Sequence, residues 1–108
     1  MTLVALQANF IQEISGLENL VNLEELYLQQ NQIKKIEGLD NNKQLVTLDI
    51  AVNKVTHLEN LDHLPLLEEL WMNWNQLADV EDNKSYLKKL HLKTIYLADN
   101  QMSMHDDY

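Results

Sequence analysis

The chain has 108 residues, which is enough for one domain with a hydrophobic core but too few for two. Eight basic and 17 acidic residues give a formal net charge of −9, which disfavours binding to nucleic acid or to an anionic membrane surface. Cysteine is absent, no apolar run is long enough to cross a membrane, and no charged-then-apolar leader opens the chain, so we expect a soluble, intracellular, acidic domain without disulfides or a thiolate zinc site.

Five asparagines recur at nearly constant spacing along the chain. The first three intervals are 22 residues and the last is 25, between Asn9, Asn31, Asn53, Asn75 and Asn100. An apolar–x–apolar triplet precedes each asparagine, and apolar residues follow at fixed offsets, as in the leucine-rich-repeat pattern L-x-x-L-x-L-x-x-N-x-L. The sequence therefore predicts an α/β solenoid, a curved right-handed superhelix with parallel strands on its concave face and short helical or 3-10 segments on its convex side.

Five strands follow in chain order, centred on Ala5, Tyr27, Asp49, Trp71 and Tyr96. They belong to one domain with repeats at about 1–22, 23–44, 45–66, 67–91 and 92–108, which reads as an excerpt of a longer array without caps. Because uncapped repeats expose apolar edges, we expect self-association through the ends, or fraying of the first and last repeats.

The repeats share turn residues, and the fourth repeat adds one helix. The five repeating asparagines are expected to be mostly buried, since an amide can satisfy loop backbone groups in its own repeat and in a neighbouring one. Gly16, Gly38 and Asn60 share one repeat position, where we expect a positive φ. The fourth repeat is three residues longer, and its segment 82–90 predicts a helix with Tyr86, Leu87 and Leu90 on the buried face.

Catalytic and metal-binding patterns are lacking. No glycine-rich phosphate loop is present, and His57, His63, His91 and His105 show no metal-ligand spacing, so we expect ordinary solvated histidines. The tripeptide Asn83-Lys84-Ser85 matches a glycosylation acceptor, a motif that is common by chance. We expect neither enzymatic activity nor a cofactor.

The middle residues of the strands form one outward column, in which Tyr27, Trp71 and Tyr96 are large aromatics. The carboxylates of Glu25, Asp49 and Glu69 flank them. Because tyrosine and tryptophan are frequent anchors of protein interfaces, these six residues are the candidate partner-binding site. Trp74, at the end of its strand, could instead pack the turn.

Several segments resemble one family. They are 36–39 (Ile-Glu-Gly-Leu), 48–53 (Leu-Asp-Ile-Ala-Val-Asn), 70–75 (Leu-Trp-Met-Asn-Trp-Asn) and 94–97 (Thr-Ile-Tyr-Leu), which are similar to the C-terminal repeats of the leucine-rich-repeat regulatory subunits of protein phosphatase 1. The resemblance implies a solenoid that binds the protein phosphatase 1 catalytic subunit in the nucleus and cytoplasm, with Asp49, Glu69, Trp71 and Tyr96 at contact positions. The segment Asn100-Gln101-Met102 departs from the family, because it lacks the proline expected after the asparagine.

Two other functions remain open. A generic intracellular leucine-rich-repeat adaptor, axonemal or cytoskeletal, would use the same face for a different partner. An adhesion protein of the bacterial internalin type also uses 22-residue repeats, but the convex segment 34–37 (Lys-Lys-Ile-Glu) and the missing leader disfavour it.

Overall fold

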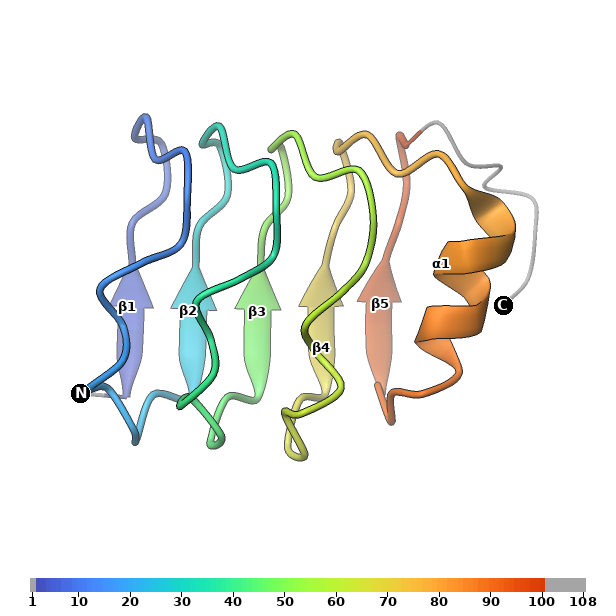
Figure 1. Cartoon of the computed structure of the whole chain (residues 1–108). Helices are drawn as coiled ribbons and strands as arrows, with labels where there is room; N and C mark the ends of the chain where they lie inside the picture. The colour runs from blue at the N-terminus through green and yellow to red at the C-terminus, as the bar shows by residue number, and fades with distance from the viewer. Residues whose placement is uncertain (1, 101–108) are drawn as a thin grey trace.

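The computed structural model describes residues 2–100, apart from the side chain of Val80. His105 and the end of the fifth repeat lie outside the described residues. The described elements are β1 (Leu3–Ala5), β2 (Glu25–Tyr27), β3 (Thr47–Asp49), β4 (Glu69–Trp71), α1 (Val80–Leu87) and β5 (Thr94–Tyr96). The five strands form one parallel sheet in chain order (Figure 1). The predicted leucine-rich-repeat solenoid is confirmed, but within residues 2–100 its convex side has α1 and otherwise turns and bends, not the expected 3-10 segments.

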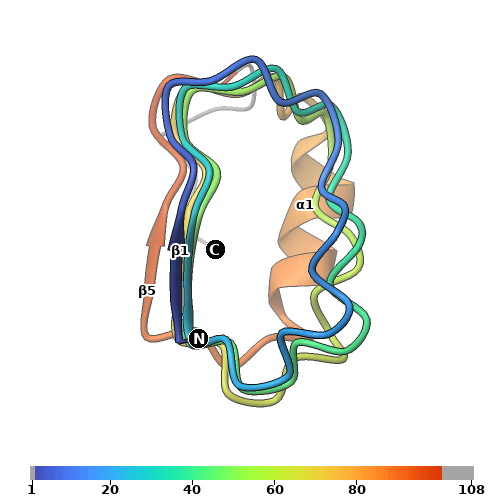
Figure 2. The same ribbon diagram turned by 90° about the vertical axis from the view of Figure 1, so that its left-hand side faces the viewer.

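Each coil of the solenoid closes around a leucine-rich core. The strands line one wall, and α1 with the irregular convex segments lines the other (Figure 2). Leu26, Leu48 and Leu70, the central residues of the three inner strands, are fully buried between these walls. The register advances by one repeat at every step, so that Val4, Leu26, Leu48, Leu70 and Ile95 are successive partners.

The repeating asparagines link neighbouring coils. Asn53 donates to the Leu28 carbonyl of the preceding coil at 3.0 Å, and its Oδ1 accepts from the Ile33 amide at 3.0 Å. Asn31, Asn53 and Asn75 are buried, as expected, and Asn100 is half-buried. The expectation is wrong for Asn9, which is exposed because no described coil lies in front of it.

Two rows of residues adopt the left-handed conformation. Gly16, Gly38 and Asn60 have φ of 79°, 77° and 59°, which confirms the prediction for this turn. The second row, which the sequence did not predict, immediately precedes the repeating asparagines and consists of Ala8, Gln30, Val52, Trp74 and Asp99. None of its members is glycine, so composition gave no signal for it.

Helix α1 differs from the predicted segment at both ends. It begins at Val80 because Asp79 caps it, with the Asp79 carboxylate accepting from the Asp82 amide at 3.0 Å. It ends at Leu87 rather than at residue 90. Leu87 is buried, and Tyr86 and Leu90 pack against the core as expected.

Candidate functional site

The parallel register aligns the outward residues of the strands into columns. We call this surface the strand face and define it by Leu3, Ala5, Gln7, Glu25, Tyr27, Gln29, Thr47, Asp49, Ala51, Glu69, Trp71, Asn73, Thr94, Tyr96 and Ala98. Asp49 is paired with Trp71, and Trp71 with Tyr96, on adjacent strands. Glu69 is two residues before Trp71 on β4, and so points to the same side of the sheet. The structure therefore brings these four predicted residues together, and places Glu25 and Tyr27 beside them on β2.

Trp71 and Tyr96 form a stacked pair. Their ring centroids are 3.8 Å apart and their planes differ by 14°. Trp71 is half-buried, whereas Tyr96 keeps 42 % of its surface exposed. The stack is a preformed flat apolar surface, so little side-chain freedom would be lost when a partner covers it.

Tyr27 and Glu25 form a hydrogen-bonded pair within β2. The Tyr27 hydroxyl donates to Glu25 Oε1 at 2.7 Å. This bond, together with burial and the nearby charges of Glu25, Glu69 and Asp49, raises the pKa of Tyr27 to about 12. Tyr27 is therefore neutral at physiological pH, and it holds the Glu25 carboxylate in place.

Asp49 is a half-buried carboxylate that forms no ion pair with any residue between 2 and 100. Its Oδ1 accepts from the Ala51 amide at 3.0 Å, which favours the charged form. Burial acts in the opposite direction and more strongly, so the pKa of Asp49 is raised above its ordinary value.

The strand face carries negative charge only. Its charged residues are Glu25, Asp49 and Glu69, and none of its positions carries a lysine, arginine or histidine. The Thr47 hydroxyl lies 3.5 Å from Glu69 Oε2, at the outer limit of a hydrogen bond. These carboxylates favour a basic surface on the partner.

Trp74 lies outside the strand face. It follows β4 with a φ of 61°, and 58 % of its surface is exposed. It therefore does not pack the turn, which was one of its two expected roles. Because it shares its chemistry with Trp71 but not its location, it serves as a matched control below.

Two further asparagines, Asn42 and Asn83, are buried, and the sequence analysis did not predict this burial. Asn42 donates to the carbonyls of Leu17 and Leu20, at 3.0 and 3.1 Å. Asn83, only 1 % exposed, accepts from the Leu58 amide at 2.9 Å and donates to the Asp79 carbonyl. These bonds make Asn83 structural, and its burial keeps the Asn83-Lys84-Ser85 motif from accepting a glycan in the folded chain.

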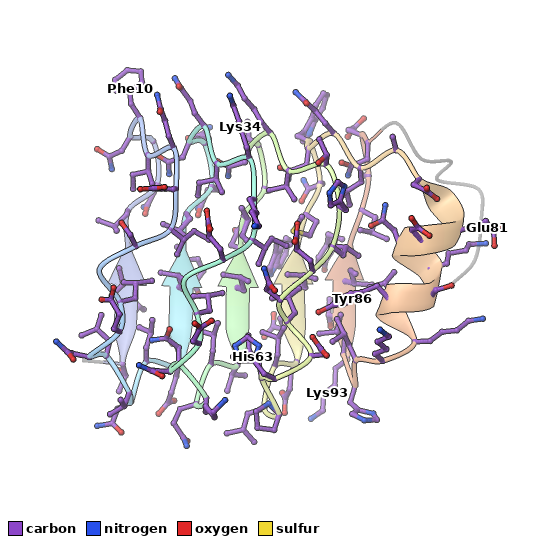
Figure 3. The ribbon with its side chains drawn as sticks, viewed as in Figure 1. Phe10, Lys34, His63, Glu81, Tyr86 and Lys93 are labelled. Carbon is purple, nitrogen blue, oxygen red and sulfur yellow. The ribbon has the colours of Figure 1, made fainter. Side chains whose placement is uncertain are left out.

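The described cavities lie away from the strand face. One of about 400 Å³ is lined by His57, Tyr86 and Lys89, on the convex side where Tyr86 extends from α1 (Figure 3). Another cavity, of about 200 Å³, is lined in part by Glu18 and Asp40.

The histidines and acids form no metal site within residues 2–100, where no group of three potential ligands is found. His63 is half-buried and not simply solvated, since its Nε2 lies 2.9 Å from the Leu39 carbonyl oxygen. No described helix has the length and apolar character of a membrane-spanning segment.

Comparisons with known proteins agree with this architecture. Residues 4–41 match the family model described as leucine rich repeats (2 copies). No curated protein matches the chain significantly.

Three solved structures are similar over most of the chain. Internalin C2 of Listeria monocytogenes is 32 % identical with a TM-score of 0.75, over 92 % of this chain and 43 % of that one. A chain of the SNF/U2A′ complex of Drosophila melanogaster is 24 % identical with a TM-score of 0.82, over 93 % and 59 %. A leucine-rich-repeat protein of Leptospira interrogans is 29 % identical with a TM-score of 0.66, over 78 % and 21 %.

The present chain thus spans less than two thirds of each of these structures. The leucine-rich-repeat fold suggests a protein–protein interaction scaffold.

Proposed function

We propose that this scaffold binds the basic surface of a folded protein partner through its strand face. The observation that carries the proposal is the stacked, partly exposed Trp71–Tyr96 pair with Asp49 and Glu69 beside it. Interface hot spots are typically aromatic residues near the centre of a patch, where neighbours exclude water. The stacked pair on β4 and β5 supplies two aromatic residues whose faces shield each other from water, which an isolated exposed aromatic does not.

The dimensions of the sheet suit such a role. Five strands spaced by about 4.8 Å span about 19 Å, and the 15 positions of the strand face are most of the roughly 20 residues that one side of a small standard interface uses. The carboxylates at the edge of the aromatic pair would steer a basic partner and set its orientation. Their contribution is expected to decrease as salt is added.

The specific partner that we propose is the catalytic subunit of protein phosphatase 1, encountered in the nucleus and cytoplasm. The support is the resemblance described above, in which Asp49, Glu69, Trp71 and Tyr96 match contact positions of the family by residue type. Tyr27 and Glu25 would extend the same contact across β2. One structural neighbour belongs to a protein complex, which is consistent with partner binding by coils of this kind.

The test is the affinity of the catalytic subunit for the wild-type chain, Trp71→Ala and Trp74→Ala, measured by isothermal titration calorimetry. Trp71→Ala should weaken binding by about 2–4 kcal/mol, because it removes the larger ring of the stacked Trp71–Tyr96 pair. Trp74→Ala removes an equally large exposed side chain off the face, and should bind like wild type, as should Lys35→Ala on the convex side. Equal losses for Trp71→Ala and Trp74→Ala would contradict the strand-face assignment.

An adhesion protein of the internalin type is the second candidate. It is favoured by the 32 % identity to internalin C2, against the sequence argument that disfavoured it. Its partner would be a protein on a cell surface, bound through the same face. If the phosphatase does not bind, fluorescently labelled wild-type chain that stains intact cells more than Trp71→Ala would support this candidate, and equal staining would contradict it.

A further inference from the structure

Two large apolar side chains are exposed at the edge of the solenoid where the strands end. We call this edge, at the top of Figure 1, the turn edge, and define it by residues 30–35, 52–57, 74–79 and Asp99. Val52 is 42 % exposed and Trp74 is 58 % exposed. They occupy the same position in neighbouring repeats, immediately before the repeating asparagine, and neighbouring coils are spaced by about 4.8 Å. Together they form one apolar patch.

The neighbouring coils leave both side chains uncovered. The Val52 amide donates to the Asn73 carbonyl of the following repeat at 2.9 Å. The Trp74 amide likewise donates to the Ala98 carbonyl of the fifth repeat at 3.0 Å. Both residues also have a positive φ, which β-branched and bulky residues rarely adopt. Neither burial nor backbone conformation therefore accounts for large apolar side chains at these two positions of inner repeats.

The charge of the turn edge changes sign along the solenoid. The second and third repeats contribute the exposed bases Lys34, Lys35 and Lys54, of which Lys34 is visible at this edge in Figure 3. The fourth and fifth repeats contribute the exposed acids Asp79 and Asp99. The apolar patch, from the third and fourth repeats, lies between the basic half and the acidic half.

Helix α1 adds acids to the acidic half. Asp79 is its N-cap, and Glu81 and Asp82 are in its first turn. The helix then runs away from the turn edge (Figure 1), and Lys84 belongs to its last turn. The basic residues of α1 therefore lie farther from the turn edge than its acidic residues do.

A two-fold axis makes this surface complementary to itself. An axis that passes between the third and fourth repeats, from the strand face to the convex side, places the third repeat of one copy against the fourth of the other, and the second against the fifth. Val52 then meets Trp74 of the other copy, and Lys54 meets its Asp79. Glu13, in the first repeat, lies outside these pairings. A two-fold axis along the solenoid would instead oppose like charges.

We propose that the turn edge binds the turn edge of a second copy of this chain, about a two-fold axis between the third and fourth repeats. The contact buries Val52 and Trp74 at its centre, and pairs the basic half of each copy with the acidic half of the other. Because the contact is isologous, it closes at a dimer. Four repeats span only about 14 Å, so the interface is small and the dimer is weak. Both strand faces remain free, which makes the dimer independent of the partner proposed above.

The test is sedimentation velocity of the full chain up to about 500 µM, a range in which mass action reveals weak association. The average mass should rise with concentration toward that of two chains and no further, and should fall with added salt. Trp74→Ala should weaken dimerisation at least about 10-fold, because it removes the larger side chain of the apolar patch. Trp71→Ala, which removes the same side chain from the strand face, should dimerise like wild type.

A second pair of variants tests the apolar patch through its smaller member. Val52→Glu should weaken dimerisation, because it places a charge in an apolar contact. Leu66→Glu is the matched control, since this leucine is exposed to a similar degree, 44 %, but lies before β4 at the opposite edge. Equal effects of Val52→Glu and Leu66→Glu, or of Trp74→Ala and Trp71→Ala, would contradict the assignment to the turn edge.

Charge changes test the two-fold arrangement. Lys34→Glu/Lys54→Glu and Asp79→Asn/Asp99→Lys should each dimerise weakly alone, because like charges or fewer unlike charges then face each other. Asparagine at position 79 keeps a residue that caps helices well. An equimolar mixture of the two variants should recover dimerisation, since the altered halves complement each other.

The control for charge is Lys43→Glu/Lys88→Glu, which changes the net charge as much as Lys34→Glu/Lys54→Glu does, at exposed positions away from the turn edge. It should dimerise like wild type. A chain that stays monomeric at the highest concentration, assemblies that grow beyond the mass of two chains, or a mixture that fails to recover dimerisation would overturn the proposal.

Discussion

Single asparagine side chains link neighbouring coils of this solenoid. The Asn53 side chain makes four hydrogen bonds, two of them to the coil before it and two within its own turn. The same residue type at Asn9 makes only local bonds and is exposed. Identical residues at identical repeat positions therefore contribute differently, and the difference depends on whether a preceding coil is present.

We predict that Asn53→Ala lowers the free energy of unfolding by about 1–3 kcal/mol, since it leaves the buried Ile33 amide unpaired and removes one of the two donors to the Leu28 carbonyl. Asn9→Ala should change this free energy by less than about 0.5 kcal/mol, as expected for an exposed position. Urea denaturation followed by circular dichroism measures both values. A loss for Asn9→Ala as large as that for Asn53→Ala would contradict the role assigned to the coil–coil bonds.

The Tyr27–Glu25 pair gives a prediction for alkaline pH. With a pKa of about 12 in the folded chain against the ordinary tyrosine value of 10.0, Tyr27 keeps its proton in the folded state while the unfolded state loses it. The stabilisation from this pair is therefore fully present below pH 10, and it is lost as the pH rises from 10 to 12.

Absorbance at the tyrosinate band should show a late titration in the wild-type chain that Tyr27→Phe reduces by the share of one tyrosine, since burial also raises the pKa of Tyr86. Glu25→Gln should bring this titration to lower pH, because it removes the charge that favours the protonated hydroxyl. Tyr96→Phe is the control, and should leave the late titration in place. A late titration of unchanged amplitude in Tyr27→Phe would contradict the assignment.

At the scale of elements, the turn position shared by Gly16, Gly38 and Asn60 has a positive φ in three repeats whose surroundings differ. A Cβ at Gly38 would lie 2.3 Å from the Ile14 carbonyl oxygen, whereas a Cβ at Gly16 would meet nothing within 4 Å. Asn60 at the same position donates from its amide to the Ile36 carbonyl at 2.7 Å. In the third repeat a side-chain bond thus replaces the close backbone approach of the second.

Gly38→Ala should therefore lower stability more than Gly16→Ala. Both variants place alanine in the left-handed conformation, which costs about 1–2 kcal/mol, but only the first also collides with a backbone atom. The difference between their free energies of unfolding isolates the collision. Equal losses in urea denaturation would show that the backbone at residue 38 shifts away from Ile14 without cost, and would contradict the effect assigned to the collision.

The sequence predicts the elements more reliably than the contacts between their side chains. The strands and their order follow from the 22-residue period, because the L-x-L triplets must align when the coils stack. The Trp71–Tyr96 stack and the Tyr27–Glu25 bond depend on side-chain rotamers, which a period does not determine. The boundaries of α1 were missed because the capping role of Asp79 lies just outside the segment with helical periodicity.

At the scale of the whole molecule, stability is expected to vary along the solenoid. Each inner coil packs against two neighbours, whereas the first described coil packs against one. In repeat proteins the neighbour contacts supply much of the stability, so the loss of one face weakens an end coil. The exposure of Leu6 and of Asn9 is the local evidence of this difference.

Amide hydrogen exchange measured by mass spectrometry should show the resulting gradient. In a sample diluted to about 1 µM, where association is negligible by mass action, amides of residues 2–14 should exchange at least about 10-fold faster than those of 46–58, because local opening of the first coil breaks one coil–coil contact and not two. The matched segments occupy the same positions in their repeats, so neighbour number is the main structural difference between them. Leu48→Ala, which opens a cavity in the middle coil, should reduce the gradient by weakening the inner coil. Uniform exchange along the diluted wild-type chain would show that the five coils open as one cooperative unit, and that the first coil needs no neighbour for its stability.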